Sequence, residues 1–298
     1  MAPTLPWMRV LGAMIVFLTP ACSQRAREIR SFRVRTRKYT MKMPHTSGDS
    51  LSRYSLVCLL LLGGSVDLAA GEAKDEGWKF NFTPYAWGAS LKGRVATLPG
   101  APPADIDVSL SDILSNLDIG LMGVGGARKG RFAVFGDLFY SRISSDADTR
   151  GLLFSGVDYE QKLFFASAGV SWRMLDEDDY QLSALAGLRY YYLDNELKLD
   201  GAALPTTKID HDEDWVDPMI GLQGRVRLAT NWYASARVTT AIAGDSDTAY
   251  GLFGGIGYVF NKSLSTVVGY RYMKLDYEKG DFLFDVEMKG PTAGLAFH

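Results

Sequence analysis

From about residue 78 onward, the chain is built of stretches in which apolar side chains alternate with small or polar ones. In residues 131–144, Val134 and Leu138 fall on one face, and Asp137 and Ser141 fall on the other. A period of two is that of a β-strand with two different faces. Clusters of Gly, Pro, Asn and Asp mark the breaks and predict ten strands, at about 78–91, 117–129, 131–144, 157–174, 179–199, 214–228, 230–243, 249–260, 263–278 and 283–297.

The connections between these strands are of two kinds that alternate along the first part of the chain. The connections at 129–130, 175–179, 229–231 and 261–263 are short, whereas 92–116, 145–156 and 200–213 are long. Short periplasmic turns, longer external loops and an even strand number are typical of an antiparallel up-and-down β-barrel in a bacterial outer membrane. The all-β fold class therefore predicted is a ten-stranded transmembrane barrel, with eight strands as the alternative if two hairpins are misread.

Aromatic residues fall at two heights on this frame, as expected for the two interfaces of a bilayer. The apolar face is then expected to meet outer-membrane lipid. A soluble β-sandwich or lipocalin-like barrel also alternates, but it gives no reason for aromatic belts at two heights. The predicted membrane-interface aromatics are Phe132, Trp172, Trp232, Phe260 and Phe297 near the periplasmic ends, and Tyr140, Tyr190, Tyr192, Tyr270 and Tyr272 higher up.

Charged residues of both signs fall on the other face, which is expected to line the lumen. A small barrel has little room inside, so we expect these groups to pair with one another and plug it. The surplus of Arg also suits a narrow pathway for anions or small solutes, and this stays as the alternative. The predicted luminal charge network consists of Asp137, Asp217, Arg131, Arg173, Arg189, Arg225, Arg237 and Arg271.

The first 70 residues differ in composition from the rest. An apolar run at 55–66 follows Arg53 and precedes small residues at 68–73, which is the pattern of a secretory signal. We therefore expect an N-terminal extension plus a cleaved signal over 1–70, with the signal at about 51–70, and a barrel over 71–298. The earlier part, which includes a second apolar run at 10–18, is interpreted as sequence upstream of a start at Met41 or Met43.

Net charge and cysteine content narrow the function classes. Residues 1–53 carry ten Lys and Arg and two acidic residues, a net of +8, while the whole chain is −2, so the remainder carries −10. An acidic body argues against nucleic acid as a partner. Both cysteines, Cys22 and Cys58, precede residue 70, so the exported part lacks thiols. No Cys or His ligand set is present, and neither a metal nor a cofactor is expected.

One short helix is predicted in the first external loop. Residues 109–117 begin with Ser109-x-x-Asp112, an N-cap signal, and carry apolar residues at 110, 113, 114 and 117. The helix is expected either to cover the barrel mouth as a lid or, in the favoured interpretation, to rest its apolar face on the rim.

Three segments resemble the small outer-membrane β-barrel proteins of proteobacteria, many of them uncharacterised. These segments are Trp78–Gly88, Gly136–Tyr140 and the chain end Gly290–His298, in which Phe297 precedes a final His. The resemblance covers about 77–298 and implies a location in the outer membrane of a Gram-negative bacterium. It also implies that the barrel-insertion machinery reads the C-terminal strand. It carries over no catalytic residue.

The acidic stretch 210–214 is the one candidate for catalysis. It resembles omptin proteases only in placing Asp and His high on a ten-stranded barrel. His211 beside Asp212 and Asp214 has the residue types of a general base, but five ionisable residues in a row are usually a solvated loop. We therefore predict a non-enzymatic barrel with a structural or surface-interaction role and a plugged or narrow lumen. A small-solute or anion channel and a surface hydrolase are the alternatives.

Overall fold

A computed structural model describes residues 77–100, 102–148, 154–201 and 205–298. The expected signal at about 51–70, both cysteines and the predicted division at residue 70 lie outside these described residues. Within them, no helix is long and apolar enough to cross a membrane.

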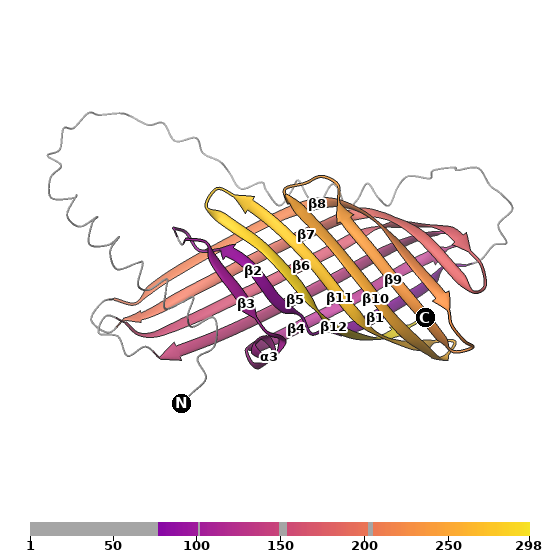
Figure 1. The fold of residues 1–298 in the computed structure, drawn as a ribbon, viewed down its shortest axis with the longest axis horizontal. Helices are drawn as coiled ribbons and strands as arrows, with labels where there is room; N and C mark the ends of the chain where they lie inside the picture. Colours follow the sequence, from indigo (N-terminus) through magenta and orange to yellow (C-terminus); the bar gives the residue numbers. More distant parts are fainter. Residues whose placement is uncertain (1–76, 101, 149–153, 202–204) are drawn as a thin grey trace. The chain divides into compact units, whose positions relative to one another are not determined.

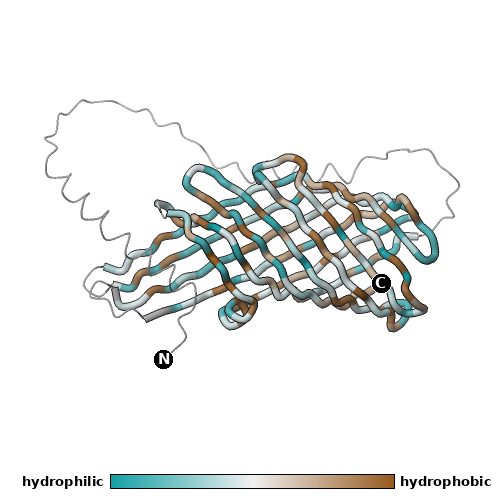
Figure 2. The backbone as a smooth tube through the Cα atoms, in the orientation of Figure 1, coloured by the Kyte–Doolittle hydropathy of each residue, from teal (hydrophilic) through white to brown (hydrophobic). Residues whose placement is uncertain are grey.

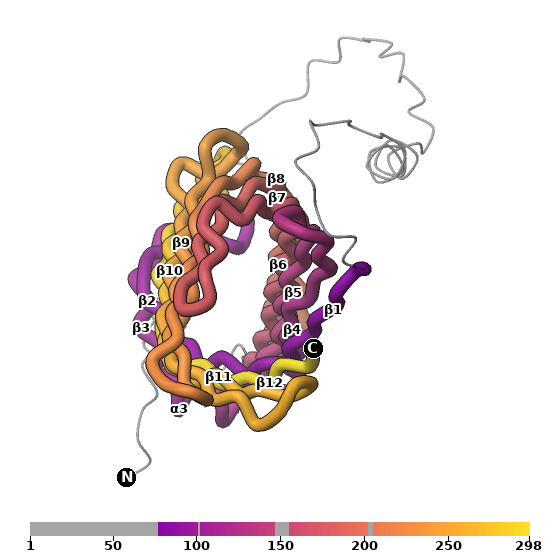
Figure 3. The backbone as a smooth tube through the Cα atoms, turned by 90° about the vertical axis from the view of Figure 1, so that its right-hand side faces the viewer, coloured from indigo at the N-terminus to yellow at the C-terminus, as the bar shows by residue number. Residues whose placement is uncertain are grey.

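Ten strands form a closed antiparallel barrel, which confirms the predicted fold class and strand number. Each strand pairs with the next, and β1 closes the ring by pairing with β12, with Phe82 opposite Phe297 and Trp87 opposite Thr292. Figure 3 shows this ring end-on, with β1 beside β12. The barrel strands are β1 (Lys79–Trp87), β4 (Leu117–Lys129), β5 (Phe132–Asp148), β6 (Phe154–Asp176), β7 (Tyr180–Gly201), β8 (Thr207–Arg227), β9 (Trp232–Ala241), β10 (Thr248–Asn261), β11 (Leu264–Lys279) and β12 (Phe282–Phe297).

Strands β5 to β8 run further outward than the sequence predicted, and Figure 1 shows them extending past the other strands. Residues 145–148 and 207–213, expected in loops, belong to β5 and β8. The reason is that alternation continues there but the outward residues become charged, as in Asp158 and Glu160 of β6 and Asp194 of β7. A strand that leaves the membrane needs polar residues on its outer face, and from sequence this looks like a loop.

The first external loop also holds two strands that were not predicted. β2 (Ser90–Ala96) pairs with the outer half of β12, and β3 (Ala104–Val108) folds back on β2. Gly88 and Ala89 separate β1 from β2, and the Gly88 amide donates a hydrogen bond of 2.9 Å to the carbonyl of Pro291 on β12. The segment from β1 to β2 therefore follows β12 along nearly its whole length.

The predicted helix is present as α3 (Leu110–Ser115). Ser109 and Asp112 form a capping box, in which the Ser109 hydroxyl accepts from the Asp112 amide and the Asp112 carboxylate accepts from the Ser109 amide, each at 3.3 Å. No residue of α3 is buried, and the Leu114 side chain is 58% exposed. The helix lies beside the barrel wall (Figure 1), with the Leu110 side chain against Gly88.

The wall has one exposed apolar face and one buried face. Outward residues such as Leu138, Val170 and Ile220 are 36–44% exposed, whereas their inward neighbours Asp137 and Met219 are 7% and 5% exposed. The alternation is visible along the strands in Figure 2. An exposed apolar surface on a closed barrel is the surface that meets lipid, because neither strand edges nor unpaired backbone groups are left to the membrane.

The contact between β6 and β7 depends on two facing glycines. Gly169 and Gly187 are partners in the register, and a Cβ added at Gly169 would lie 2.3 Å from the carbonyl oxygen of Ala186. Gly169→Ala is therefore expected to force the strands apart and lower the free energy of unfolding by about 1–3 kcal/mol, the usual cost of overpacking. Urea unfolding of the detergent-solubilised barrel measures it.

Gly254 in β10 is the matched control, since no atom lies within 4 Å of an added Cβ there. Gly254→Ala should leave the unfolding midpoint unchanged. Equal effects of the two substitutions would show that the close approach of β6 and β7 is not a constraint.

Candidate functional site

The outer half of the lumen is filled by a layer of aromatic side chains. Phe139 of β5 stacks on Phe165 of β6, with ring centroids 4.5 Å apart and an interplanar angle of 2°. Tyr191 of β7 stacks on Trp215 of β8 at 5.0 Å, and Trp215 stacks on Tyr277 of β11 at 3.9 Å. Trp87 of β1 meets the ring of Phe139 edge-on at 5.7 Å. These six side chains, the aromatic plug, are between 0% and 4% exposed.

The aromatic plug belongs to an apolar cluster to which every barrel strand contributes. Strands β1, β5 to β8 and β10 to β12 supply its buried members, and Met122 of β4 and Ala241 of β9 pack against it. Its buried members pack against one another from strands around the ring, and each of them is at most 7% exposed.

The aromatic plug was not predicted from the sequence, although the residues that form it follow a pattern. On β5, β6 and β7, the inward-facing residue next to Asp137, Ser167 or Arg189 on the extracellular side is aromatic. These aromatic residues are Phe139, Phe165 and Tyr191. Each also stands next to an outward aromatic, namely Tyr140, Phe164 or Tyr190. Such pairs look like continuous interface girdles unless each residue is assigned to a face.

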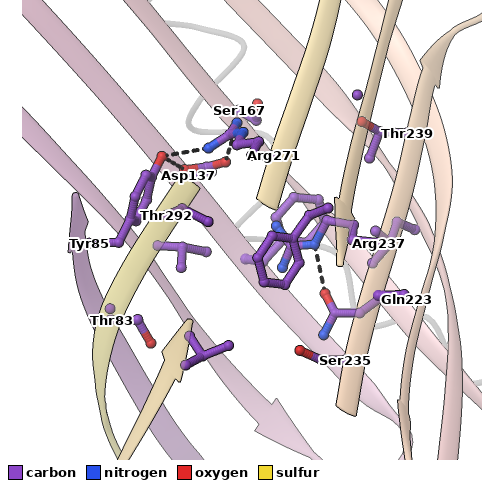
Figure 4. Close-up of a pocket in the computed structure, with 18 of the residues that line it drawn as sticks. Thr83, Tyr85, Asp137, Ser167, Gln223, Ser235, Arg237, Thr239, Arg271 and Thr292 are labelled. Carbon is purple, nitrogen blue, oxygen red and sulfur yellow. Dashed lines mark hydrogen bonds and ion pairs between the residues drawn. The ribbon is translucent and has the colours of Figure 1, made fainter. Parts of the chain in front are cut away.

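Below the aromatic plug, a buried ion pair joins β5 to β11. Arg271 Nη2 lies 3.2 Å from Asp137 Oδ2, and the two side chains are 14% and 7% exposed. The Tyr85 hydroxyl donates to Asp137 Oδ1 at 2.8 Å and accepts from Arg271 Nη1 at 2.7 Å (Figure 4). The Arg271 guanidinium also lies 4.8 Å from the ring centroid of Trp87, within cation–π range. Arg271 thus connects the charged layer to the aromatic plug.

The guanidinium groups of three other predicted luminal arginines contact neutral partners. Arg189 donates to the Ser167 hydroxyl at 2.8 Å, and Arg237 donates to the Gln223 amide oxygen at 2.8 Å (Figure 4). The Arg225 guanidinium lies 3.6 Å above the ring centroid of Tyr233. Across the described residues, none of these three guanidinium groups forms an ion pair.

The remaining predicted members are not brought into one network. Asp217 is 1% exposed and accepts hydrogen bonds from the amides of Asp245 and Ser246, each at 3.1 Å, so it fixes the turn between β9 and β10. Arg173 pairs with Asp176 at 2.7 Å near the periplasmic end of β6. Arg131 is exposed in the turn after β4. Among the predicted members, the structure joins Asp137 and Arg271 across the lumen.

A cavity of about 260 Å³ lies on the periplasmic side of the aromatic plug. Arg189, Arg225, Arg237 and Arg271 line it, and Asp137 is its single acidic residue. The exposed residues Asn81 and His298, at the periplasmic ends of β1 and β12, also line it. Thr83, Ser235 and Thr292 add hydroxyl groups among apolar walls (Figure 4). The cavity is thus strongly basic and reaches the periplasmic end of the barrel.

The long strands carry a ladder of ion pairs on their outer face beyond the membrane. Glu160 of β6 binds Arg142 of β5 at 2.5 Å and Lys162 at 3.1 Å, and Lys162 reaches Asp194 of β7 at 3.0 Å. Hydrogen bonds to Asp194 and Glu160 raise the pKa of Lys162, so it stays charged. Exposed pairs contribute little stability, and their effect here is to hold a fixed pattern of charge.

The inner face of the same extension carries an apolar cluster. Val157, Leu197 and Leu199 form a second buried cluster with Leu98, which follows β2. The first external loop therefore packs into the outer mouth through the residues after β2, whereas α3 stays beside the wall.

The candidate catalytic residues at 210–214 are divided between the two faces of β8. His211 faces inward, with its ring centroid 5.5 Å from that of Phe282 and Nε2 3.7 Å from Glu213 Oε1. The side chains of Asp212 and Asp214 point to the opposite, outer face of β8, where they are exposed. The strand period therefore separates His211 from both carboxylates. No group of three or more His, Cys, Asp and Glu suited to a metal ion occurs within the described part.

The predicted interface aromatics all point outward, and the register aligns several of them. Phe132 is the partner of Trp172, and Tyr140, Phe164 and Tyr192 occupy one row across β5, β6 and β7. Those near the periplasmic ends, Phe132, Trp172, Trp232, Phe260 and Phe297, are 39–54% exposed. Tyr270 is 54% exposed, and Tyr140, Tyr190, Tyr192 and Tyr272 are half-buried.

No protein-family model matches the chain, and no curated protein matches its sequence. Among solved structures, the outer-membrane protease OmpT from Escherichia coli is similar over 73% of this chain and 96% of that one, with 11% identity and a TM-score of 0.50. The attachment invasion locus protein Ail of Yersinia pestis is similar over 74% and 98%, with 15% identity and a TM-score of 0.34. Neisserial surface protein A is similar over 74% and 99%, with 14% identity and a TM-score of 0.30.

The likeness to OmpT shows the fold alone, which is that of an outer-membrane β-barrel. The chain forms such a barrel. Its closed ring and lipid-facing apolar belt place it in the outer membrane of a Gram-negative bacterium, as the sequence predicted.

The ion pair between Asp137 and Arg271 is expected to be required for stability. Asp137→Ala leaves the Arg271 guanidinium buried without its carboxylate, and breaking one partner of a buried pair costs about 3–5 kcal/mol. Asp212→Ala, on the exposed outer face of β8, is the control and should leave the unfolding midpoint unchanged. Chemical unfolding in detergent micelles tests both. Equal midpoints for Asp137→Ala and wild type would contradict the assignment.

Proposed function

We propose that this protein is a non-enzymatic outer-membrane barrel with a closed lumen, and that its structural or surface-interaction role is carried by the external wall. The observation that carries the proposal is the aromatic plug, supported by the apolar cluster to which all ten strands contribute. Water passes poorly through a hydrophobic constriction, and at the level of the aromatic plug this lumen is filled by buried apolar side chains. The anion-channel alternative thus lacks a continuous polar path.

The external wall supports a surface-interaction role. Strands β6, β7 and β8 are 23, 22 and 21 residues long, about twice the roughly ten residues that a tilted strand needs to cross a bilayer. Their charged outer faces are paired across neighbouring strands, which fixes the pattern that a partner would meet. A partner that binds long paired strands also loses less conformational entropy than one that must order a mobile loop, because the strands are already ordered.

The placement of His211 supports a non-enzymatic role. A general base must lie within hydrogen-bond reach of its orienting carboxylate and of the proton that it takes. Asp212 and Asp214 lie on the opposite face of β8, and Glu213 is shared with Lys279 at 2.9 Å. For insertion, we propose that β12, with Phe297 near its end, is the strand that the barrel-insertion machinery reads.

Single-channel recording of the protein purified from membranes tests the closed lumen. With insertion shown independently by protease protection of the external loops, the wild-type protein is expected to give no steady current in a planar bilayer. The Phe165→Ala/Trp215→Ala double variant removes two rings of the aromatic plug and should conduct, because its cavity joins the periplasmic cavity to the outer half of the lumen.

The matched control is Phe164→Ala/Trp172→Ala, which removes two aromatic rings from the lipid-facing side of β6. This variant should stay silent. A steady anion-selective current from the wild-type protein, altered by Arg271→Ala, would contradict the closed lumen and favour the channel.

A further inference from the structure

The periplasmic cavity holds more positive charge than its own residues compensate. Four arginines line it against one carboxylate, and that carboxylate, Asp137, is already paired with Arg271. Arg237 lies within electrostatic range of both Arg189 and Arg271, so the guanidinium groups also repel one another. Arginine does not deprotonate in proteins, and the charge cannot be relieved by losing a proton.

Burial of these charges is expensive unless a counter-charge is supplied. A guanidinium away from bulk water needs a negative partner or a full set of acceptors. Arg237 has five N–H donors, of which the structure assigns one to Gln223, and Arg189 donates to the Ser167 hydroxyl and to the Met273 sulfur. The unassigned donors of Arg237 belong to a residue that lines the cavity. The lining therefore presents a donor-rich, positively charged surface with hydroxyl groups at its sides.

Access to this surface is from the periplasm. The aromatic plug closes the outer side, and none of its six residues lines the cavity. Asn81 and His298 line the other end and are exposed, and Arg225 lies near that end on the ring of Tyr233. A ligand would enter past these residues and stop at the aromatic plug.

We propose that this cavity is a blind, periplasm-facing binding site for a small oxyanion, held by Arg189 and Arg237, with Arg225 at its periplasmic end. The planar fork of Arg fits two oxygens of a phosphate or carboxylate group, and two such forks within electrostatic range of each other suit an anion with several acceptor oxygens. The volume of about 260 Å³ is just below the range of about 300–1,000 Å³ typical of ligand pockets, so the site takes a headgroup-sized molecule.

Binding of inorganic phosphate to the purified full-length exported protein in a non-ionic detergent tests the site. Titration calorimetry at constant ionic strength, with chloride as the balancing anion, is expected to show saturable binding. Arg237→Gln should weaken it by about tenfold or more, the factor that corresponds to one charge-assisted hydrogen bond. Arg225→Gln, nearer the periplasmic end, provides the same test if Arg237→Gln does not fold.

Arg94→Gln is the matched control, because Arg94 is exposed on β2 outside the cavity. This variant should bind phosphate as the wild type does. Absence of saturable binding to the folded wild type, or equal weakening in Arg94→Gln and Arg237→Gln, would overturn the proposal. Neither result bears on the closed lumen, which is judged by conductance.

A second titration distinguishes a free anion from a lipid headgroup. Dihexanoyl phosphatidylglycerol, below its micelle concentration, offers the same phosphate group with short acyl chains. Tighter binding than inorganic phosphate, lost in Arg237→Gln, supports the site with a phospholipid headgroup as its ligand. If the lipid binds more weakly than inorganic phosphate, and Arg237→Gln abolishes phosphate binding, the site is supported with a free anion as its ligand.

Discussion

The two-residue period of a closed β-sheet is the constraint on which the rest of this structure depends. Once β1 pairs with β12, every second side chain must face lipid and the others must share one narrow lumen. Contact with lipid requires apolar side chains on the outer surface, which is apolar between two rows of aromatic residues. The lumen can be filled in two ways, with apolar side chains in contact or with charged groups that pair. This barrel does both, at different heights.

Arg271 is where the two kinds of filling meet. Its guanidinium pairs with Asp137 on one side and lies over the rings of Trp87 and Phe165, at 4.8 and 5.6 Å, on the other. The face of an aromatic ring attracts a cation without accepting a conventional hydrogen bond from it. The rings can therefore contact the Arg271 guanidinium on one side and pack against other apolar rings on the other. The ion pair and the Tyr85 hydroxyl then fix the side chain against the first rings of the aromatic plug.

Residue alternation was sufficient to predict the strands, because outward Leu, Val and Ile mark the lipid face wherever the wall crosses the membrane. It was insufficient above the membrane, where outward residues such as Glu160 and Asp194 are charged and the strand resembles a loop. It also missed β2, whose pairing with β12 joins residues nearly 200 positions apart in the chain, and β3, which pairs with β2. Asp217 is buried, but its hydrogen-bond partners are the backbone amides of Asp245 and Ser246, which no charge pattern reveals.

The height at which charge is placed in the lumen also determines which compartment can reach it. An apolar layer excludes water, and charges on its outer side would be open to the cell surface, whereas charges on its inner side are open to the periplasm. On β5, β6 and β7 the polar residues Asp137, Ser167 and Arg189 all lie one inward position toward the periplasm from Phe139, Phe165 and Tyr191. Because this order repeats on three neighbouring strands, the arginine surplus lies on the periplasmic side of the aromatic plug, and the charged outer wall lies on the other side.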